Sequence, residues 1–136
     1  MPTMNSNDER IAREVLQALA QITFLMRDQA VTIRRLSSVK ETLTAVEFYD
    51  SAEGPPILSG YVDAKLKDDT AVSWLLDMTW TDKIWTVDSK LASSAGGEQD
   101  ILQELPTITV QTVGELPQRL VETVRRLLEL RPPALN

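Results

Sequence analysis

The sequence of 136 residues contains no cysteine and no histidine. Without cysteine there is no disulfide, no thiolate nucleophile and no thiolate ligand for zinc or haem. Without histidine there is no imidazole to serve as a metal ligand or as the base of a catalytic triad. These two absences remove many enzyme classes, and we expect neither a metal nor an organic cofactor.

Glycine is also scarce, and none of the five glycines falls in a phosphate-binding GxGxxG or Walker pattern. The chain has no GxSxG nucleophile motif either. We therefore assign no catalytic residue and expect a binding protein rather than an enzyme. The glycines are Gly54, Gly60, Gly96, Gly97 and Gly114.

Long apolar runs are missing as well. No stretch approaches the ~18 uncharged apolar residues that cross a membrane. The first nine residues lack the basic start and apolar run of a secretory signal. From these features we expect a cytoplasmic protein without a membrane partner.

Acidic charge is concentrated in the middle of the chain. The whole sequence has 14 Lys and Arg against 20 Asp and Glu, a net charge of −6. Residues 41–104 hold thirteen acidic and four basic residues, or −9, whereas residues 1–40 carry +2 and residues 105–136 carry +1. Phosphate backbones repel such a block, so we expect no nucleic acid partner. A basic protein surface would be attracted to it, although the same charge also serves solubility alone.

The apolar spacing predicts a single α+β domain over residues 1–136 that begins with one long helix. Apolar residues recur at steps of three and four over residues 8–38, from Ile11 through Ile22 to Leu36. A helix of this length spans ~46 Å, which is longer than a small sheet. We therefore expect one end to overhang, to kink or to meet a second copy, and its additional apolar stripe suggests a homodimer through this helix.

Between residues 43 and 92 the apolar period changes to two, which is typical of strands. Short turns rich in Asp, Gly and Pro separate the apolar segments, so we expect an antiparallel meander. A two-residue loop at Thr81-Asp82 would place Met78 opposite Trp85, and a three-residue loop at 68–70 would place Gly60 opposite Met78. The four predicted strands are Leu43–Asp50, Ile57–Lys67, Ala71–Trp80 and Lys83–Ala92.

After Gly96-Gly97 the pattern is less regular. We expect a helical turn at 98–105, a fifth strand or an extended edge at 107–113, and a second helix at 115–130 that stops at Pro132-Pro133. Each helix has one main apolar stripe and the sheet has one apolar face. Both helices should therefore lie on that face, which gives a two-layer α+β fold.

The other face of the predicted sheet is the candidate partner-binding site. Three interpretations of its polar side chains are open: an ordinary solvated sheet face, a protein-binding face, or a carboxylate site for a metal or for catalysis. The predicted separations between the carboxylates are too wide for metal binding. In the predicted register one row holds Tyr61, Asp77 and Thr86, and the next holds Asp63, Leu75 and Asp88. The candidate partner-binding residues are Tyr61, Asp63, Leu75, Asp77, Ile84 and Asp88.

Three tryptophans, Trp74, Trp80 and Trp85, fall on the apolar face. They form either core or the lining of a pocket between sheet and helices. The order helix–meander–helix is similar in outline to cystatin-like and NTF2-like sheets, and the size and charge resemble those of small acidic secretion chaperones. This likeness of shape brings no functional residue with it.

The leading hypothesis is a non-enzymatic binding or adaptor protein that holds a basic partner on its acidic sheet face, as a toxin-neutralising immunity protein or a small chaperone would. The alternative is a small-molecule binder or cofactor-free enzyme with a tryptophan-lined pocket.

Overall fold

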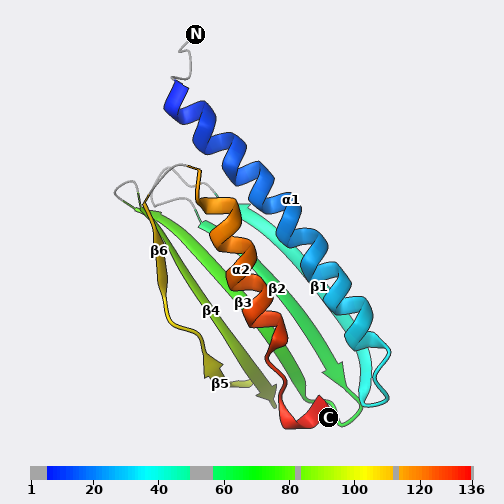
Figure 1. The fold of residues 1–136 in the computed structure, drawn as a ribbon. Coiled ribbons are helices and arrows are strands. Elements are labelled where there is room, and N and C mark those ends of the chain that lie inside the picture. The colour runs from blue at the N-terminus through cyan, green and yellow to red at the C-terminus, as the bar shows by residue number, and fades with distance from the viewer. Residues whose placement is uncertain (1–5, 50–56, 82–83, 112–113, 136) are drawn as a thin grey trace.

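The computed structural model describes residues 6–49, 57–81, 84–111 and 114–135. It confirms the predicted fold class: an antiparallel sheet with an N-terminal and a C-terminal helix on one face (Figure 1). The elements in chain order are α1 (Ser6–Arg34), β1 (Val39–Tyr49), β2 (Ile57–Leu66), β3 (Ala71–Thr81), β4 (Ile84–Ala95), β5 (Glu98–Glu104), β6 (Ile108–Val110), α2 (Leu116–Glu129) and a short 3-10 turn at Pro133–Leu135.

Strands β1 to β5 lie side by side in chain order, and β6 also pairs with β4. The helical turn predicted at 98–105 is wrong, because Glu98–Glu104 is a strand that pairs with β4. The two glycines form its tight turn, with φ of +62° at Gly96 and +89° at Gly97. Two consecutive positive φ values suit the twist of a hairpin, and glycine adopts them without a Cβ clash. The strand predicted within 107–113 is β6, which continues along the same edge of β4.

The predicted faces are correct, but the predicted registers differ from the structure by two residues. Met78 lies opposite Val87 rather than Trp85, and Gly60 lies opposite Leu76 rather than Met78. The three-residue turn after β2 is Lys67–Asp69, closed by the Leu66 N–H donating to the Thr70 carbonyl at 2.8 Å. A shift of two residues keeps every side chain on its face because strand side chains alternate with a period of two. Asp50, Asp82 and Lys83 lie outside the described residues.

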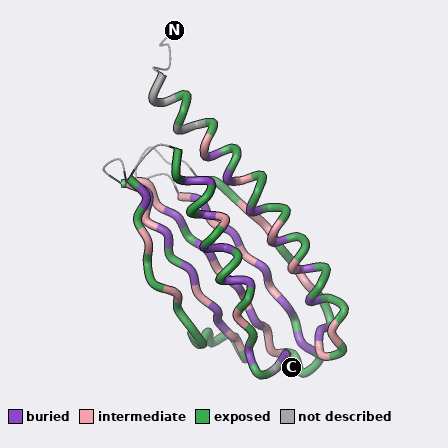
Figure 2. Tube along the Cα trace, in the orientation of Figure 1, coloured by how far each residue is buried: buried purple, intermediate pink, exposed green. Residues whose placement is uncertain are grey.

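The core lies between the sheet and the two helices, where buried residues follow every second position of β2, β3 and β4 (Figure 2). α1 covers β1 and β2, and α2 covers β3 and β4. As expected from its length, the N-terminal end of α1 extends past the sheet (Figure 1). α1 ends at Arg34, earlier than predicted, because Leu36 and Val39 close tight turns that lead directly into β1.

The C-terminal end of α2 is held by side chains from three different parts of the chain. The Gln29 amide of α1 donates to the Leu128 carbonyl at 3.0 Å, and the Trp74 indole of β3 donates to the Leu130 carbonyl at 3.0 Å. Arg131 donates to both carbonyls. The last carbonyls of a helix have no partner within it, so these bonds satisfy them and fix the helix over the sheet.

Candidate functional site

The side of the sheet away from the helices, here called the open face, carries the predicted partner-binding residues. Strand pairing arranges its side chains in rows that cross the sheet. The row that holds Asp77 runs from Glu47 through Ser59 and Asp77 to Asp88. The next row runs from Ala45 through Tyr61 and Leu75 to Lys90, and the one after it from Leu43 through Asp63 and Ser73 to Ala92.

This arrangement corrects the predicted rows. Asp77 lies directly opposite Asp88 rather than beside Tyr61 and Thr86. Tyr61 lies opposite Leu75, and Asp63 is one row away opposite Ser73. The two-residue difference in register explains the change, since it moves each strand by one row along its neighbour.

The predicted site residues divide into one group and one outlier. Tyr61, Leu75 and Asp63 are half-buried near the middle of the sheet, and Asp77 and Asp88 are exposed in the adjoining row. Ile84 instead pairs with Thr81 at the end of the sheet, about 13 Å along β4 from Asp88. The structure therefore brings five of the six candidates together and leaves Ile84 apart.

Each of the three aspartates accepts a hydrogen bond from a hydroxyl on another segment. Ser73 donates to Asp63 at 2.5 Å and Ser59 donates to Asp77 at 2.7 Å, both across neighbouring strands. Thr107, in the link between β5 and β6, donates to Asp88 at 2.5 Å. These bonds orient the carboxylates but leave their charge uncompensated. The ion pair that the described residues do contain, Arg13 with Glu9, is on α1.

Two further carboxylates belong to the open face and were not among the candidates. Glu104 pairs with Lys90 at the β4–β5 border, and Glu47 begins the row that contains Asp77. Glu104 was missed because its segment was interpreted as a helical turn. The alternation of β1 could have identified Glu47, since it falls on the same parity as Leu43.

With these residues the open face holds six carboxylates and two lysines among its paired positions, a net charge of −4. They are Glu41, Glu47, Asp63, Asp77, Asp88 and Glu104, with Lys65 and Lys90.

A hollow of about 250 Å³ opens where the chain leaves β5 and passes to β6. Three of the carboxylates border it together with Lys90. Leu75 and Leu105 add apolar surface, and Thr107 lies beside Asp88. Its lining is Leu75, Asp77, Asp88, Ser89, Lys90, Glu104, Leu105 and Thr107. In the described part of the chain, no group of three or more acidic side chains has a geometry that could hold a metal ion.

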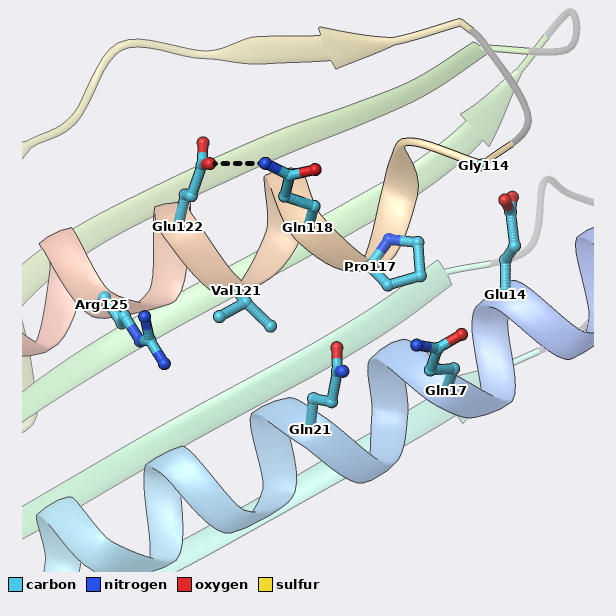
Figure 3. A pocket seen from close by; sticks show the side chains of 9 residues that line it. All are labelled: Glu14, Gln17, Gln21, Gly114, Pro117, Gln118, Val121, Glu122 and Arg125. Carbon is cyan, nitrogen blue, oxygen red and sulfur yellow. Dashed lines mark hydrogen bonds between the residues drawn. The ribbon is translucent and has the colours of Figure 1, made fainter.

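A second hollow lies between the two helices (Figure 3). This groove of about 560 Å³ is lined by Glu14 and two glutamines of α1 and by the first turns of α2, where Gln118 donates to Glu122 at 3.3 Å. Its lining is Glu14, Gln17, Gln21, Gly114, Pro117, Gln118, Val121, Glu122 and Arg125. Neither hollow is lined by a tryptophan.

The tryptophans lie within the core face at two places. Trp74 is fully buried at the middle of β3. Trp80 and Trp85 lie opposite each other at the end of the sheet, with ring centroids 4.9 Å apart, and Trp80 is half-buried. A tryptophan-lined ligand pocket stays a prediction.

No helix in the described residues is long and apolar enough to cross a membrane. Comparisons of the chain with protein-family models, with curated proteins and with solved structures find no match. A function must therefore be argued from the site itself.

Proposed function

We propose that this protein is a non-enzymatic binding or adaptor module whose open face holds a basic surface of a protein partner. The observation that carries the proposal is the direct pairing of Asp77 with Asp88. Like charges directly opposite in a sheet are destabilising, and no described lysine or arginine forms an ion pair with either one. A cationic side chain from a partner would remove this repulsion.

The chemistry of the hollow favours arginine as the contacting side chain. A planar guanidinium carries five N–H donors and binds carboxylates through paired hydrogen bonds, and Asp77, Asp88 and Glu104 all border the hollow. The aliphatic part of the same side chain would pack on Leu75 and Leu105. An immunity protein or a small chaperone would use such a face, since an acidic surface also steers a basic partner toward it and speeds association.

The test compares two double variants that change the net charge by the same amount. Asp77→Asn with Asp88→Asn removes the central charges of the open face, and Asp28→Asn with Glu129→Gln removes two exposed charges from the helices. A partner is captured from a lysate of the source cells with the unchanged protein and identified, and its Kd for each form is measured by calorimetry at low and at high salt.

We expect the open-face variant to weaken binding by about tenfold or more, equivalent to about 1.4 kcal/mol. The helix variant should stay within about twofold of the unchanged protein. High salt should weaken the binding of the unchanged protein, because exposed charges are screened. Equal losses in both variants, or affinity independent of salt, would count against the proposal.

A further inference from the structure

Strand β1 forms one edge of the sheet and exposes apolar side chains on both of its faces. Among the described strands it pairs with β2 alone, so one side of its 11-residue backbone has no strand partner. Leu43 is 52%, Phe48 42% and Tyr49 53% exposed. Long apolar edge strands are usually shortened, charged or covered in proteins that stay monomeric, because their free N–H and C=O groups template pairing with another strand.

We infer that the occupant of this edge, here called the β1 edge, is β1 of a second copy of the chain, in an antiparallel two-fold pairing. The inference goes beyond the proposed function. Two copies joined in this way form one continuous sheet, and the open face of each copy stays uncovered. Packing two open faces against each other would instead bring two surfaces of net charge −4 into contact.

The exposed side chains select one register. A two-fold pairing places residues of the same face opposite each other. A pairing centred on Val46 sets Leu43 opposite the partner's Tyr49 and Phe48 opposite the partner's Thr44. All three exposed apolar side chains are then covered, and no like charges lie directly opposite.

Neighbouring registers are less favourable. A pairing centred on Thr44 sets Glu41 opposite the partner's Glu47, and like charges opposite each other destabilise a sheet. A pairing centred on Ala45 sets the apolar Leu43 opposite the partner's Glu47. The Val46-centred register therefore matches side-chain chemistry better than the registers beside it.

The pairing also brings the helix layers of the two copies together. α1 lies over β1 and β2, so the two α1 helices would lie on the same face of the joined sheet, on either side of the two-fold axis. Leu16, which is 66% exposed, lies on the side of α1 away from α2, because Gln17 and Gln21 line the groove toward α2.

The two α1 helices run antiparallel in this arrangement, so opposite helix ends lie side by side. Met26 lies beside Val46, since both would contact a Cβ added at Gly60, so the middle of α1 lies near the two-fold axis. The overhanging end, near Glu9, is about 26 Å from Met26. The partner's Lys40 is about 20 Å from the axis in the same direction.

The described charged side chains of the N-terminal part of α1 sum to zero, because Glu9 and Glu14 balance Arg10 and Arg13. Residues 34–40 carry three basic residues and no acidic one, or +3. Antiparallel pairing brings each neutral segment alongside a +3 segment at both ends of the interface, so that the two +3 segments stay apart. Opposite helix ends thus face each other, and together with the self-complementary Val46-centred register this favours a second copy over an unrelated strand.

Disulfide trapping tests the register directly, because the chain has no cysteine of its own. In Val46→Cys the two thiols face each other across the axis, with Cα atoms about 4.5–5.5 Å apart, a distance that a disulfide spans. In Thr44→Cys the two positions are four residues apart along the strand, about 13 Å, which is too far. Mild oxidation should therefore give a band at twice 15.2 kDa for Val46→Cys and not for Thr44→Cys.

Sedimentation equilibrium of the cysteine-free protein provides the second measurement. The unchanged chain should sediment as a dimer at micromolar concentrations. Leu43→Glu should shift it toward the monomer, because the added charge is buried against the partner's Tyr49. Ile101→Glu is the matched control, since Ile101 is 51% exposed on β5 and Leu43 is 52% exposed on β1, and it should leave the dimer unchanged.

A monomer at every concentration for the unchanged chain would overturn the inference, and so would a dimer that Leu43→Glu leaves intact. Crosslinking of Thr44→Cys in preference to Val46→Cys would overturn the proposed register. None of these outcomes bears on the charge test of the open face, so the two proposals fail independently.

Discussion

The two faces of the sheet differ sharply although they are made by alternate residues of the same strands. Leu76 and Asp77 are neighbours on β3, yet Leu76 is 1% exposed beneath the helices whereas Asp77 is exposed on the other side. The covered face holds the large apolar side chains, and the open face holds uncompensated charge. Residues that stabilise the fold and residues of the candidate site therefore alternate along each strand. A substitution can be chosen to change one of these properties with little effect on the other.

The largest loss of stability is expected from Trp74→Ala on the covered face. The substitution removes a fully buried indole and its hydrogen bond to the Leu130 carbonyl. The free energy of unfolding should fall by about 3–5 kcal/mol, as for other buried aromatic truncations. Urea unfolding followed by circular dichroism measures this loss. A decrease below about 1 kcal/mol would contradict the assignment of Trp74 to the core.

A smaller loss is expected from Gly60→Ala, also on the covered face. The added Cβ would lie 3.0 Å from both Sδ and Cε of Met26 and 3.5 Å from Val46. Both close atoms belong to the flexible end of a buried methionine, which must move by a few tenths of an ångström, so the loss should be about 1 kcal/mol, at the low end for overpacking. In the background of Met26→Ala the same change should cost far less, because the clashing side chain is gone, and a double-mutant cycle measures this coupling. Additive losses would show that the two side chains do not meet.

On the open face, Asp77→Asn should stabilise the protein. The amide keeps an oxygen to accept the Ser59 hydrogen bond, and the repulsion from Asp88 is lost, which is worth about 0.2–1 kcal/mol. Unfolding at low salt measures the gain, which should vanish when Asp88 is already Asn. Asp100→Asn is the control, because Asp100 lies opposite the neutral Ser93. A comparable gain there would mean that net charge, not the Asp77–Asp88 pair, sets the effect.

The smallest effect on stability is expected from the titration of Asp68 in the turn between β2 and β3. The Thr70 hydroxyl donates to its carboxylate at 2.6 Å and the Thr70 N–H at 3.0 Å, and these bonds lower the pKa of Asp68. Because the folded pKa lies below the unfolded one, the resulting stability is present above about pH 4 and is lost as the pH falls through the folded pKa.

NMR titration of Asp68 in two variants checks that the Thr70 hydroxyl lowers its pKa. Thr70→Val removes the hydroxyl, so the pKa should rise toward the ordinary aspartate value. Thr70→Ser keeps the hydroxyl and should keep the lowered pKa. Equal pKa values in the two variants would exclude the hydroxyl as the main cause.

The fold was predictable from the sequence where side-chain alternation is strict. The apolar residues of β2 and β3 occupy every second position, and this alone determines which face each residue joins. Position along the strand was harder, because it depends on which residues close each turn. Asp69 adopts a φ of +68° and ends the β2–β3 turn one residue earlier than expected. The polar residues of the turn contain little information about which of them close it.

The candidate site was predicted in kind rather than in detail. The sequence identified the acidic face and five of the residues that gather there, but the opposition of Asp77 and Asp88 required the true register. β5 was missed because Ile101, Leu102 and Leu105 have helix-like spacing. At the edge of a sheet no helix covers these residues, so burial imposes no period of two. The paired glycines before them were the available signal for a hairpin.

The positions of the three indoles give this protein a pair of built-in optical reporters. Trp74 lies about 20 Å along the strand from Trp80, in a dry setting and bonded to the last turn of α2. Trp80 and Trp85 are close enough for their excited states to interact. The near-ultraviolet dichroism of this pair would therefore follow loosening at that end of the sheet, whereas tryptophan fluorescence sums all three indoles and also responds to exposure of Trp74, both without any label.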